Sequence, residues 1–263
     1  MLKFHIFASE FANSIFKMLE KTRGIVLGII PYNDNSQFVH IYTEKFGKTT
    51  YKTSLNKTKK SNRQRNMFVP MTILDMDVEH SNTSELHQIK EATIISSPLS
   101  FCSSNPAKYA QCLYIAELTD KSIREVEQNQ LLWNFLYTST EIFLLSDLSL
   151  PLFHILFTAK LCFPLGFGID YSEYKKGMMF DMNDSQFTEE KIYHPYYLNS
   201  VSAEYLYKVL CTDYSNIDNL ALNSNEQSIM LDILLSYLKL HIPEIGEIRS
   251  VEVLKAIIDN RTL

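Results

Sequence analysis

Residues 24–30 read GIVLGII, residues 31–35 read PYNDN, and residues 38–43 read FVHIYT. Both apolar runs are rich in β-branched and aromatic side chains, which favours extended strands over helices. The proline, asparagines and aspartate between them are typical turn residues. The stretch therefore predicts two strands joined by a turn.

Three more segments on the C-terminal side have strand-like patterns: residues 48–53, 67–79 and 86–96. Together with the first two strands they make residues 21–97 β-rich. A long polar loop separates the third predicted strand from the fourth. Five strands with one such loop are typical of a small Greek-key barrel of the oligonucleotide-binding (OB) type.

The pattern changes to a helical period from Asn105 onward, with Ser104 or Asn105 as the cap and Pro106 in the first turn. Further helices are expected at about 126–145, 151–163, 200–211, 224–241 and 248–259. Ser224 and Gln227 have the spacing of a capping box. Residues 166–198 predict an irregular connection. The sequence thus predicts an α+β protein of two domains, a barrel followed by a helical domain.

Composition excludes several classes of protein. The chain has 263 residues, 46% hydrophobic and 21% charged, as in ordinary globular proteins. It has only seven glycines and no glycine-rich phosphate loop. Its four cysteines, Cys102, Cys112, Cys162 and Cys211, lack zinc-site spacing and are expected to be small buried residues in a reducing compartment. The N-terminus lacks the pattern of an export signal, which favours the cytoplasm.

Positive charge is concentrated in one segment. Residues 45–74 carry eight basic side chains and no acidic one, in a chain whose net charge is -5. Such a segment attracts polyanions, and aromatic rings within it can stack on bases. It predicts nucleic-acid binding; a solvated basic loop or a site for acidic peptides is the alternative.

No set of residues assembles a nucleophile, a base and an orienting group, so the sequence predicts a binding protein rather than an enzyme. Asp75, Asp77 and Glu79 alternate along a predicted strand and could hold Mg²⁺ for a hydrolase, or form its solvated face. The aromatic helix around Trp133 and Phe143 could line a docking groove or belong to the core.

Three stretches resemble the family of RecO DNA repair proteins. The first is residues 24–48, with GIVL, a tyrosine turn and a strand ending in TEKFGK; the second is LCFPLGF at 161–167. The third combines YLKLHI at 237–242 with RSVEVL at 249–254. Their order and spacing span residues 18 to about 256.

The resemblance implies an OB-fold DNA-binding domain at 18–99 and a helical domain at 100–263 with an insert at 166–198. Residues 1–17 are then an N-terminal extension, either upstream of the true start or an appended tail. Many relatives carry a four-cysteine zinc module in that insert, but residues 166–198 have no cysteine. No metal or cofactor is expected.

The resemblance also implies a non-enzymatic role in recombinational repair: annealing complementary strands and helping to load recombinase onto strands coated by single-strand-binding protein. The expected partners are single- and double-stranded DNA, RecR, and the acidic C-terminal tail of single-strand-binding protein, and the expected location is the cytoplasm at the nucleoid. An OB-fold adaptor for acidic peptides is the alternative. Phosphate contacts are expected from Lys48, Lys52, Lys57, Lys59, Lys60, Arg63, Arg65 and, more weakly, Arg23, with Tyr51 as a stacking platform.

Overall fold

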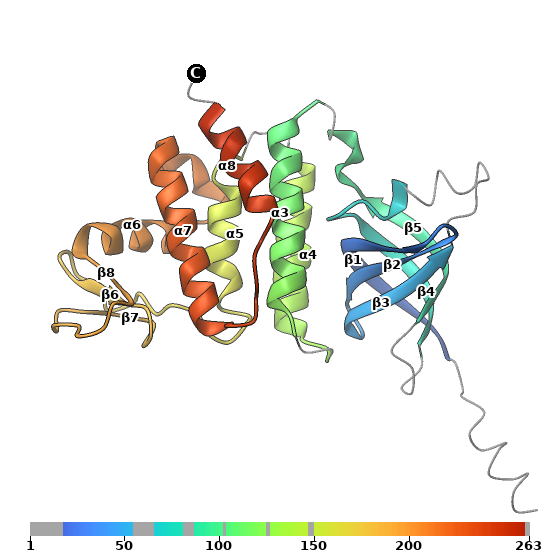
Figure 1. Cartoon of the computed structure of the whole chain (residues 1–263), viewed down its shortest axis with the longest axis horizontal. Helices are drawn as coiled ribbons and strands as arrows, with labels where there is room; N and C mark the ends of the chain where they lie inside the picture. Colours follow the sequence, from blue (N-terminus) through green and yellow to red (C-terminus); the bar gives the residue numbers. More distant parts are fainter. Residues whose placement is uncertain are drawn as a thin grey trace, which may run out of the picture.

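The computed structural model describes residues 18–54, 66–80, 87–101, 104–124, 127–146 and 150–260. A β-barrel made by the first part of the chain lies beside a bundle of helices made by the rest (Figure 1). Helix α3 packs directly on strand β1 at the junction. The α+β architecture expected from the sequence is confirmed.

The barrel is one antiparallel sheet in the order β3-β2-β1-β4-β5. Its strands are β1 (Met18–Asn33), β2 (Ser36–Thr43), β3 (Gly47–Ser54), β4 (Ile73–His80) and β5 (Gln88–Ser96). The long β1 pairs with β4 through its first half and with β2 through its second half. A parallel bridge between Tyr51 and His87 joins β3 to the start of β5 and closes the ring. This is the topology expected of an OB-type barrel.

The fourth strand begins later than the sequence predicts. Residues 66–67 are helical, residues 68–71 form turns and a bend, and Met71 has a positive φ of 68°. The N–H of Met71 donates to the carbonyl of Val26, and the N–H of Val26 donates to the carbonyl of Thr72. The apolar residues before Ile73 therefore pack beside β1 instead of extending β4.

The helices lie close to their predicted ranges: α3 (Pro106–Ser122), α4 (Gln130–Leu145), α5 (Phe153–Leu161), α6 (Ser200–Leu210), α7 (Ser224–His241) and α8 (Ser250–Asn260). Asn105 caps α3, as predicted. The capping box of α7 is formed by Asn223 and Glu226, so the assignment to Ser224 and Gln227 is wrong by one residue. No helix within the described ranges is long and apolar enough to cross a membrane.

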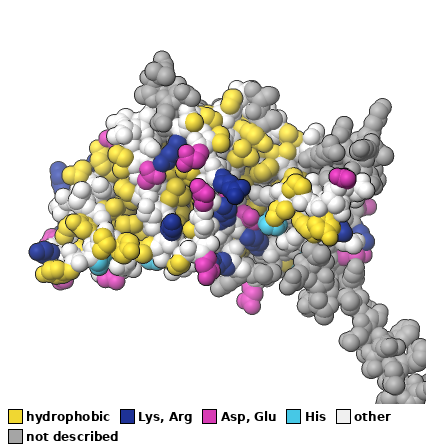
Figure 2. All heavy atoms as spheres, in the orientation of Figure 1, with side chains coloured by type: hydrophobic (Ala, Val, Ile, Leu, Met, Phe, Trp, Pro, Cys, Tyr) yellow, Lys and Arg dark blue, Asp and Glu magenta, His cyan; other side chains and the backbone are white. Residues whose placement is uncertain are grey.

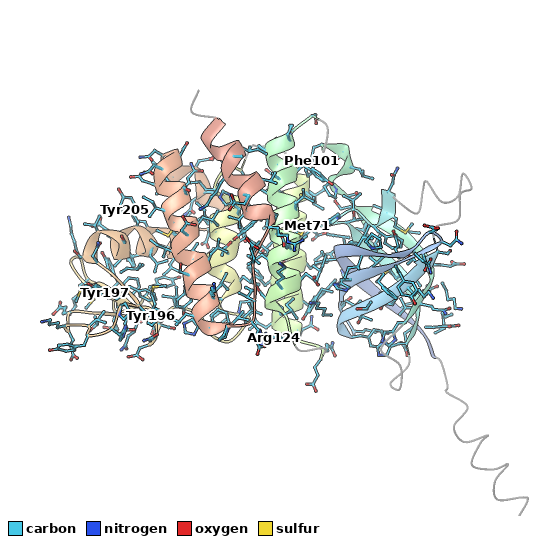
Figure 3. The ribbon with its side chains drawn as sticks, viewed as in Figure 1. Met71, Phe101, Arg124, Tyr196, Tyr197 and Tyr205 are labelled. Atoms are coloured by element: carbon cyan, nitrogen blue, oxygen red, sulfur yellow. The ribbon has the colours of Figure 1, made fainter. Side chains whose placement is uncertain are left out.

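The expectation that 166–198 is irregular throughout is wrong. The segment contains a small antiparallel sheet of β6 (Met179–Asp181), β7 (Gln186–Thr188) and β8 (Tyr197–Leu198). Asp181 Oδ1 accepts hydrogen bonds from two backbone N–H groups of the β6–β7 turn. Tyr174 stacks on Tyr207 of α6 with ring centroids 4.0 Å apart. The sheet lies at the end of the molecule far from the barrel, where Figure 3 labels Tyr196 and Tyr197.

Two hydrophobic clusters form the core, and one of them is shared by both parts of the chain. The barrel interior is a small cluster around Val26, Val39 and Ile41. The larger cluster joins the helices to the outer side of the barrel through Ile25, Leu27, Tyr42, Met71 and Ile73. Met71 is labelled at this junction in Figure 3.

The aromatic side chains of α4 belong mainly to the larger cluster. Trp133 and Phe143 are buried, so the core alternative holds for them rather than the docking groove. Cys112 and Cys162 are buried as expected, whereas Cys211 is exposed; Cys102 lies outside the described residues.

Candidate nucleic-acid interface

The outer face of β1, β2 and β3 carries three rows of side chains across the strands. In OB-type barrels the outer face of strands 2 and 3 binds oligonucleotides. Strand pairing defines the rows; the lower row is Ile25–Tyr42–Lys48, the middle row is Gly28–His40–Thr50, and the upper row is Ile30–Phe38–Lys52. The alternate residues of β2 and β3 point into the barrel.

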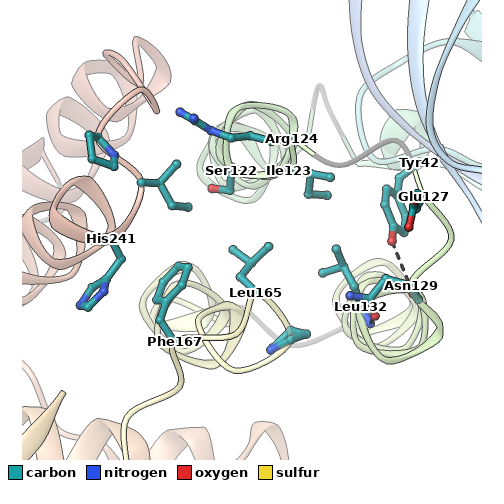
Figure 4. A pocket seen from close by; sticks show the side chains of 13 residues that line it. Tyr42, Ser122, Ile123, Arg124, Glu127, Asn129, Leu132, Leu165, Phe167 and His241 are labelled. Atoms are coloured by element: carbon teal, nitrogen blue, oxygen red, sulfur yellow. Dashed lines mark hydrogen bonds between the residues drawn. The ribbon is translucent and has the colours of Figure 1, made fainter. Parts of the chain in front are cut away.

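The helical domain covers the lower row. Tyr42 is fully buried, and its ring lies over that of Trp133 at a centroid distance of 6.4 Å. Its hydroxyl donates to the carbonyl of Asn129 at 3.4 Å, drawn as a dashed line in Figure 4. Burial raises the pKa of Tyr42 to about 12, so the hydroxyl keeps its proton. A pocket of about 260 Å³ beside it reaches His241 at the end of α7.

Lys48 is engaged by the end of α3. Its Nζ lies 3.0 Å from Oδ1 of Asp120 and donates to the carbonyls of Asp120 and Ile123. His40 of the middle row places Nδ1 3.0 Å from the same Oδ1. Burial would raise the pKa of Asp120, but hydrogen bonding with His40 and the charge of Lys48 outweigh it and hold that pKa below its usual value. Lys48 thus joins the two domains.

Arg23 is engaged in the same way. Its guanidinium makes two hydrogen bonds of 2.9 Å to the carboxylate of Glu44. It also lies 4.6 Å from the ring centre of Tyr137 and 5.7 Å from that of Trp133 on α4. The bonds to Glu44 raise the pKa of Arg23 above its ordinary value. Arg23 and Lys48 are therefore held at the domain junction and are not free cations.

The upper row is open. Ile30 is 49% exposed, and Phe38 is half-buried beside Tyr32 of the β1–β2 hairpin, with ring centroids 4.8 Å apart. Tyr32 is 59% exposed, and the Nζ of Lys52 lies 5.4 Å from its ring centre. Over the barrel, Figure 2 shows hydrophobic and basic side chains on neighbouring surface. Of the described residues predicted to contact phosphate, Lys52 is the one whose ammonium reaches solvent without an acidic partner.

Sequence reasoning missed Tyr32 and Phe38. Tyr32 lies near the end of β1, in a stretch that the sequence assigns to the turn, and a strand pattern alone does not say which residue lies across from Phe38. The pairing of Phe38 with Lys52 follows from the strand register, which local composition does not fix.

Tyr51, predicted to be a stacking platform, is corrected by the structure. It is 0% exposed and belongs to the barrel interior, with its ring 6.1 Å from that of His87. Because Lys48, Thr50 and Lys52 face outward, the strand period turns Tyr51 inward. Its ring offers no face to a base in this conformation.

The remaining predicted contacts are Lys57, Lys59, Lys60, Arg63 and Arg65, and they lie outside the described residues. Their segment follows Ser54, the last residue of β3. Ser54 is paired with Ser36 at the β1–β2 hairpin, the same end of the barrel as the upper row. The chain therefore leaves β3 at the open end of the face.

Lysines pair with two of the three carboxylates in the acidic row on β4. Asp77 lies 3.9 Å from Lys21, and Glu79 lies 2.8 Å from Lys90, as distances between charged atoms. Asp75 is exposed. Among the described residues, no three His, Cys, Asp or Glu side chains gather where they could hold a metal ion. The geometry favours the solvated face over the Mg²⁺ alternative.

Comparison with known proteins agrees with this division of the chain. Residues 18–98 match the family model "Recombination protein O N terminal", and residues 103–247 match "Recombination protein O C terminal". The chain is 33% identical over 243 residues to the DNA repair protein RecO of Azobacteroides pseudotrichonymphae, covering 92% of this chain and all of that protein.

Two other proteins of the same name show the same extent of similarity. That of Bacteroides fragilis is 30% identical over 92% of this chain and all of its own length, and that of Flavobacterium psychrophilum is 28% identical over 90% and 98%. With both family models matched in order along the chain, this protein belongs to the RecO family of DNA repair proteins.

Proposed function

We propose that this protein is a DNA-binding recombination mediator, without catalytic activity of its own, that anneals complementary strands during DNA repair. Family membership supports the repair role. The observation that carries the DNA site is the open upper row: Lys52, the exposed ring of Tyr32 and the half-buried ring of Phe38 lie at the end of β3 from which the basic segment continues.

Charge supplies the mechanism of annealing. Two complementary strands repel each other through their phosphates, and this repulsion slows their encounter. Lys52 together with Lys57, Lys59, Lys60, Arg63 and Arg65 can neutralise phosphates of both strands while the bases stay free to pair. The rest of the surface is acidic overall and repels DNA, so that the encounter is oriented toward the barrel.

The proposal includes two protein partners, RecR and single-strand-binding protein. A groove of about 1020 Å³ lies between α4 and the end of α5, and it is the proposed site for the acidic C-terminal tail of single-strand-binding protein. Ile142 and Phe163 are exposed on its walls. Nζ of Lys160 lies 2.9 Å from Asp213 there, and a tail carboxylate can replace that exposed partner.

An annealing assay tests the DNA site. Complementary labelled oligonucleotides are mixed with the full-length protein and with a variant in which five basic residues become alanine: Lys57, Lys59, Lys60, Arg63 and Arg65. The matched control removes five lysines from the helical domain: Lys175, Lys176, Lys191, Lys208 and Lys239. We expect annealing without metal ions that is lost in the first variant and kept in the control.

Salt dependence gives a second measure. If about six basic residues touch single-stranded phosphates, log affinity should fall against log salt with a slope of about -4. A slope near zero, or a control variant as defective as the first, contradicts the proposal. Absence of any DNA binding favours the adaptor that recognises acidic peptides.

A peptide titration tests the groove. An acidic peptide ending in an apolar residue should bind the intact protein, and Ile142→Asp should abolish that binding. Ile229→Asp on α7, an isoleucine of similar exposure outside this groove, is the control. Equal loss in both variants contradicts the groove as the tail site.

A further inference from the structure

We infer that Tyr32 and Phe38 form a stacking site for about one or two unpaired bases, and that this site makes DNA binding selective for single strands. The inference rests on the proposed function and extends it from phosphate charge to base recognition. It assigns the stacking role to residues of the β1–β2 hairpin and β2 rather than to Tyr51.

The two rings are arranged so that a base can reach them. Tyr32 and Phe38 lie 4.8 Å apart at 52°, so they form a tilted pair and not a closed stack. Exposed aromatic rings are costly to leave in water, and flat π-faces are what every base can stack on. Ile30 extends the same row on β1 as an exposed apolar neighbour.

Lys52 lies where it can pair with a phosphate beside the rings. Its ammonium rests 5.4 Å from the ring centre of Tyr32, and its backbone is paired with that of Phe38. An exposed cation–π contact is weak, so the flexible lysine can leave the ring and follow a phosphate. The ring face that it vacates is then open to the base attached to that phosphate.

The helical domain limits how much of this face a DNA strand can reach. The lower row is covered by α3 and α4, and His40 of the middle row is bound to Asp120. Among the described residues of this face, a strand therefore meets aromatic surface only at the upper row. Bases on either side of that contact remain unstacked by the protein, as annealing requires.

Paired bases cannot use the site. In a duplex each base is already stacked between its neighbours, and only its edges reach the grooves. A duplex would contact the barrel through phosphates alone. Removing the bases from a single strand should have the same effect, and this provides the test.

The experiment compares two probes, oligo-dT and an oligonucleotide of equal length made of abasic sites, by fluorescence anisotropy at one salt concentration. Full-length protein should bind oligo-dT about 5- to 100-fold more tightly than the abasic strand. Tyr32→Ala should bring this ratio close to one and leave the salt slope unchanged. Phe38→Leu should also lower this ratio. Because leucine keeps the apolar volume, the variant separates loss of the ring from a folding defect.

Tyr193→Ala is the matched control, because Tyr193 is 88% exposed on the insert and the Nζ of Lys191 also lies 5.4 Å from its ring centre. It should leave the ratio unchanged. Lys52→Ala should weaken binding of both probes by the same factor. An unchanged ratio in Tyr32→Ala overturns the stacking site while DNA binding stands; failure of the intact protein to bind either probe overturns the proposed function as well.

Discussion

Lys48 and Lys52 face the same side of β3 but have different roles. Lys48 is tied to Asp120 and to the carbonyl end of α3, whereas Lys52 rests on an exposed ring. Removing Lys48 leaves Asp120 and a helix end without their cation. Lys48→Ala should therefore lower the free energy of unfolding by about 2 kcal/mol, the usual size for a lost bond to a charged group.

Lys52→Ala is the counterpart. We expect a change in unfolding free energy of less than about 0.5 kcal/mol for this exposed site. The slope of log affinity against log salt should become less steep by about 0.7, the loss of one single-stranded phosphate contact. Urea unfolding and DNA titrations on both variants decide the matter; the reverse pattern would contradict these assignments.

Tyr51 shows where residue-level prediction failed. The charge of the basic segment was sufficient to predict a polyanion site, but charge carries no information about which neighbours share a face. Lys52 and Tyr51 are adjacent in a strand and must point to opposite sides. Tyr32, near the end of β1, was missed because its proposed stacking role depends on Phe38 and Lys52, and the strand register that joins them is not local.

A stack of rings connects the β2–β3 turn, the end of β4 and the residue before β5. Phe46 and His80 lie 3.9 Å apart, and His80 and His87 lie 4.2 Å apart, both pairs nearly parallel. Burial lowers the pKa of both histidines, and a charge on His80 would lower the pKa of His87 further, while Glu20 partly raises the pKa of His80. The folded barrel therefore resists protonation that the unfolded chain accepts.

The sign of the pH effect follows from linkage. The unfolded chain takes up these protons below about pH 6.5, so the barrel has its full stability above that value and loses stability as pH falls. We expect the Tm of the native protein to fall from pH 7.5 to 5.5. In the double variant His80→Phe/His87→Phe, which keeps the ring stack, the Tm should fall less over the same pH range. Parallel curves for the two proteins would show that these rings do not titrate in this range.

Helix α7 illustrates the precision of prediction for an element. Asn223 accepts a hydrogen bond from the N–H of Glu226, whose carboxylate accepts one from the N–H of Asn223. The pair Ser224 and Gln227 has the same spacing, so the sequence predicted the helix over 224–241 but placed its capping box one residue too late. Asn223→Ala should lower stability by about 1 kcal/mol, and Ser224→Ala by less than half of that, in thermal or urea unfolding. Equal losses would place the cap elsewhere.

Longer elements were predicted well and the insert poorly for one reason. Strands of eight residues and helices of nine or more repeat their period often enough to be recognised. The strands β6, β7 and β8 have two or three residues and leave no periodic pattern. The turn at 66–72 was misread because its apolar residues are buried without being extended.

The two parts of the chain are separate in sequence but share a core. Ile25, Leu27 and Tyr42 on the barrel are buried against the helices. Residues 18–101 alone would expose them together with Met71 and Ile73 as one apolar surface. We expect that fragment to aggregate or bind hydrophobic dyes, whereas the full chain stays monodisperse and unfolds in a single transition. A soluble fragment with a sharp transition of its own would contradict a shared core.

The sequence did not predict this junction. Asp120 and Lys48 are brought together by the packing of distant segments, and no local pattern links them. Both domains and the basic segment follow from periodicity and charge. Which half of the barrel face stays open depends on where the helices dock.

The shared core also has a consequence for synthesis on the ribosome. The barrel cannot close until β5 has emerged, since the second edge of β3 is joined to β5 and not to β4, the next strand in sequence. Its outer apolar side must then wait for α3 and α4, which end only at Leu145. During that interval the nascent chain exposes an apolar surface. The yield of folded protein in the cell should therefore depend on translation speed and on chaperones that bind nascent chains.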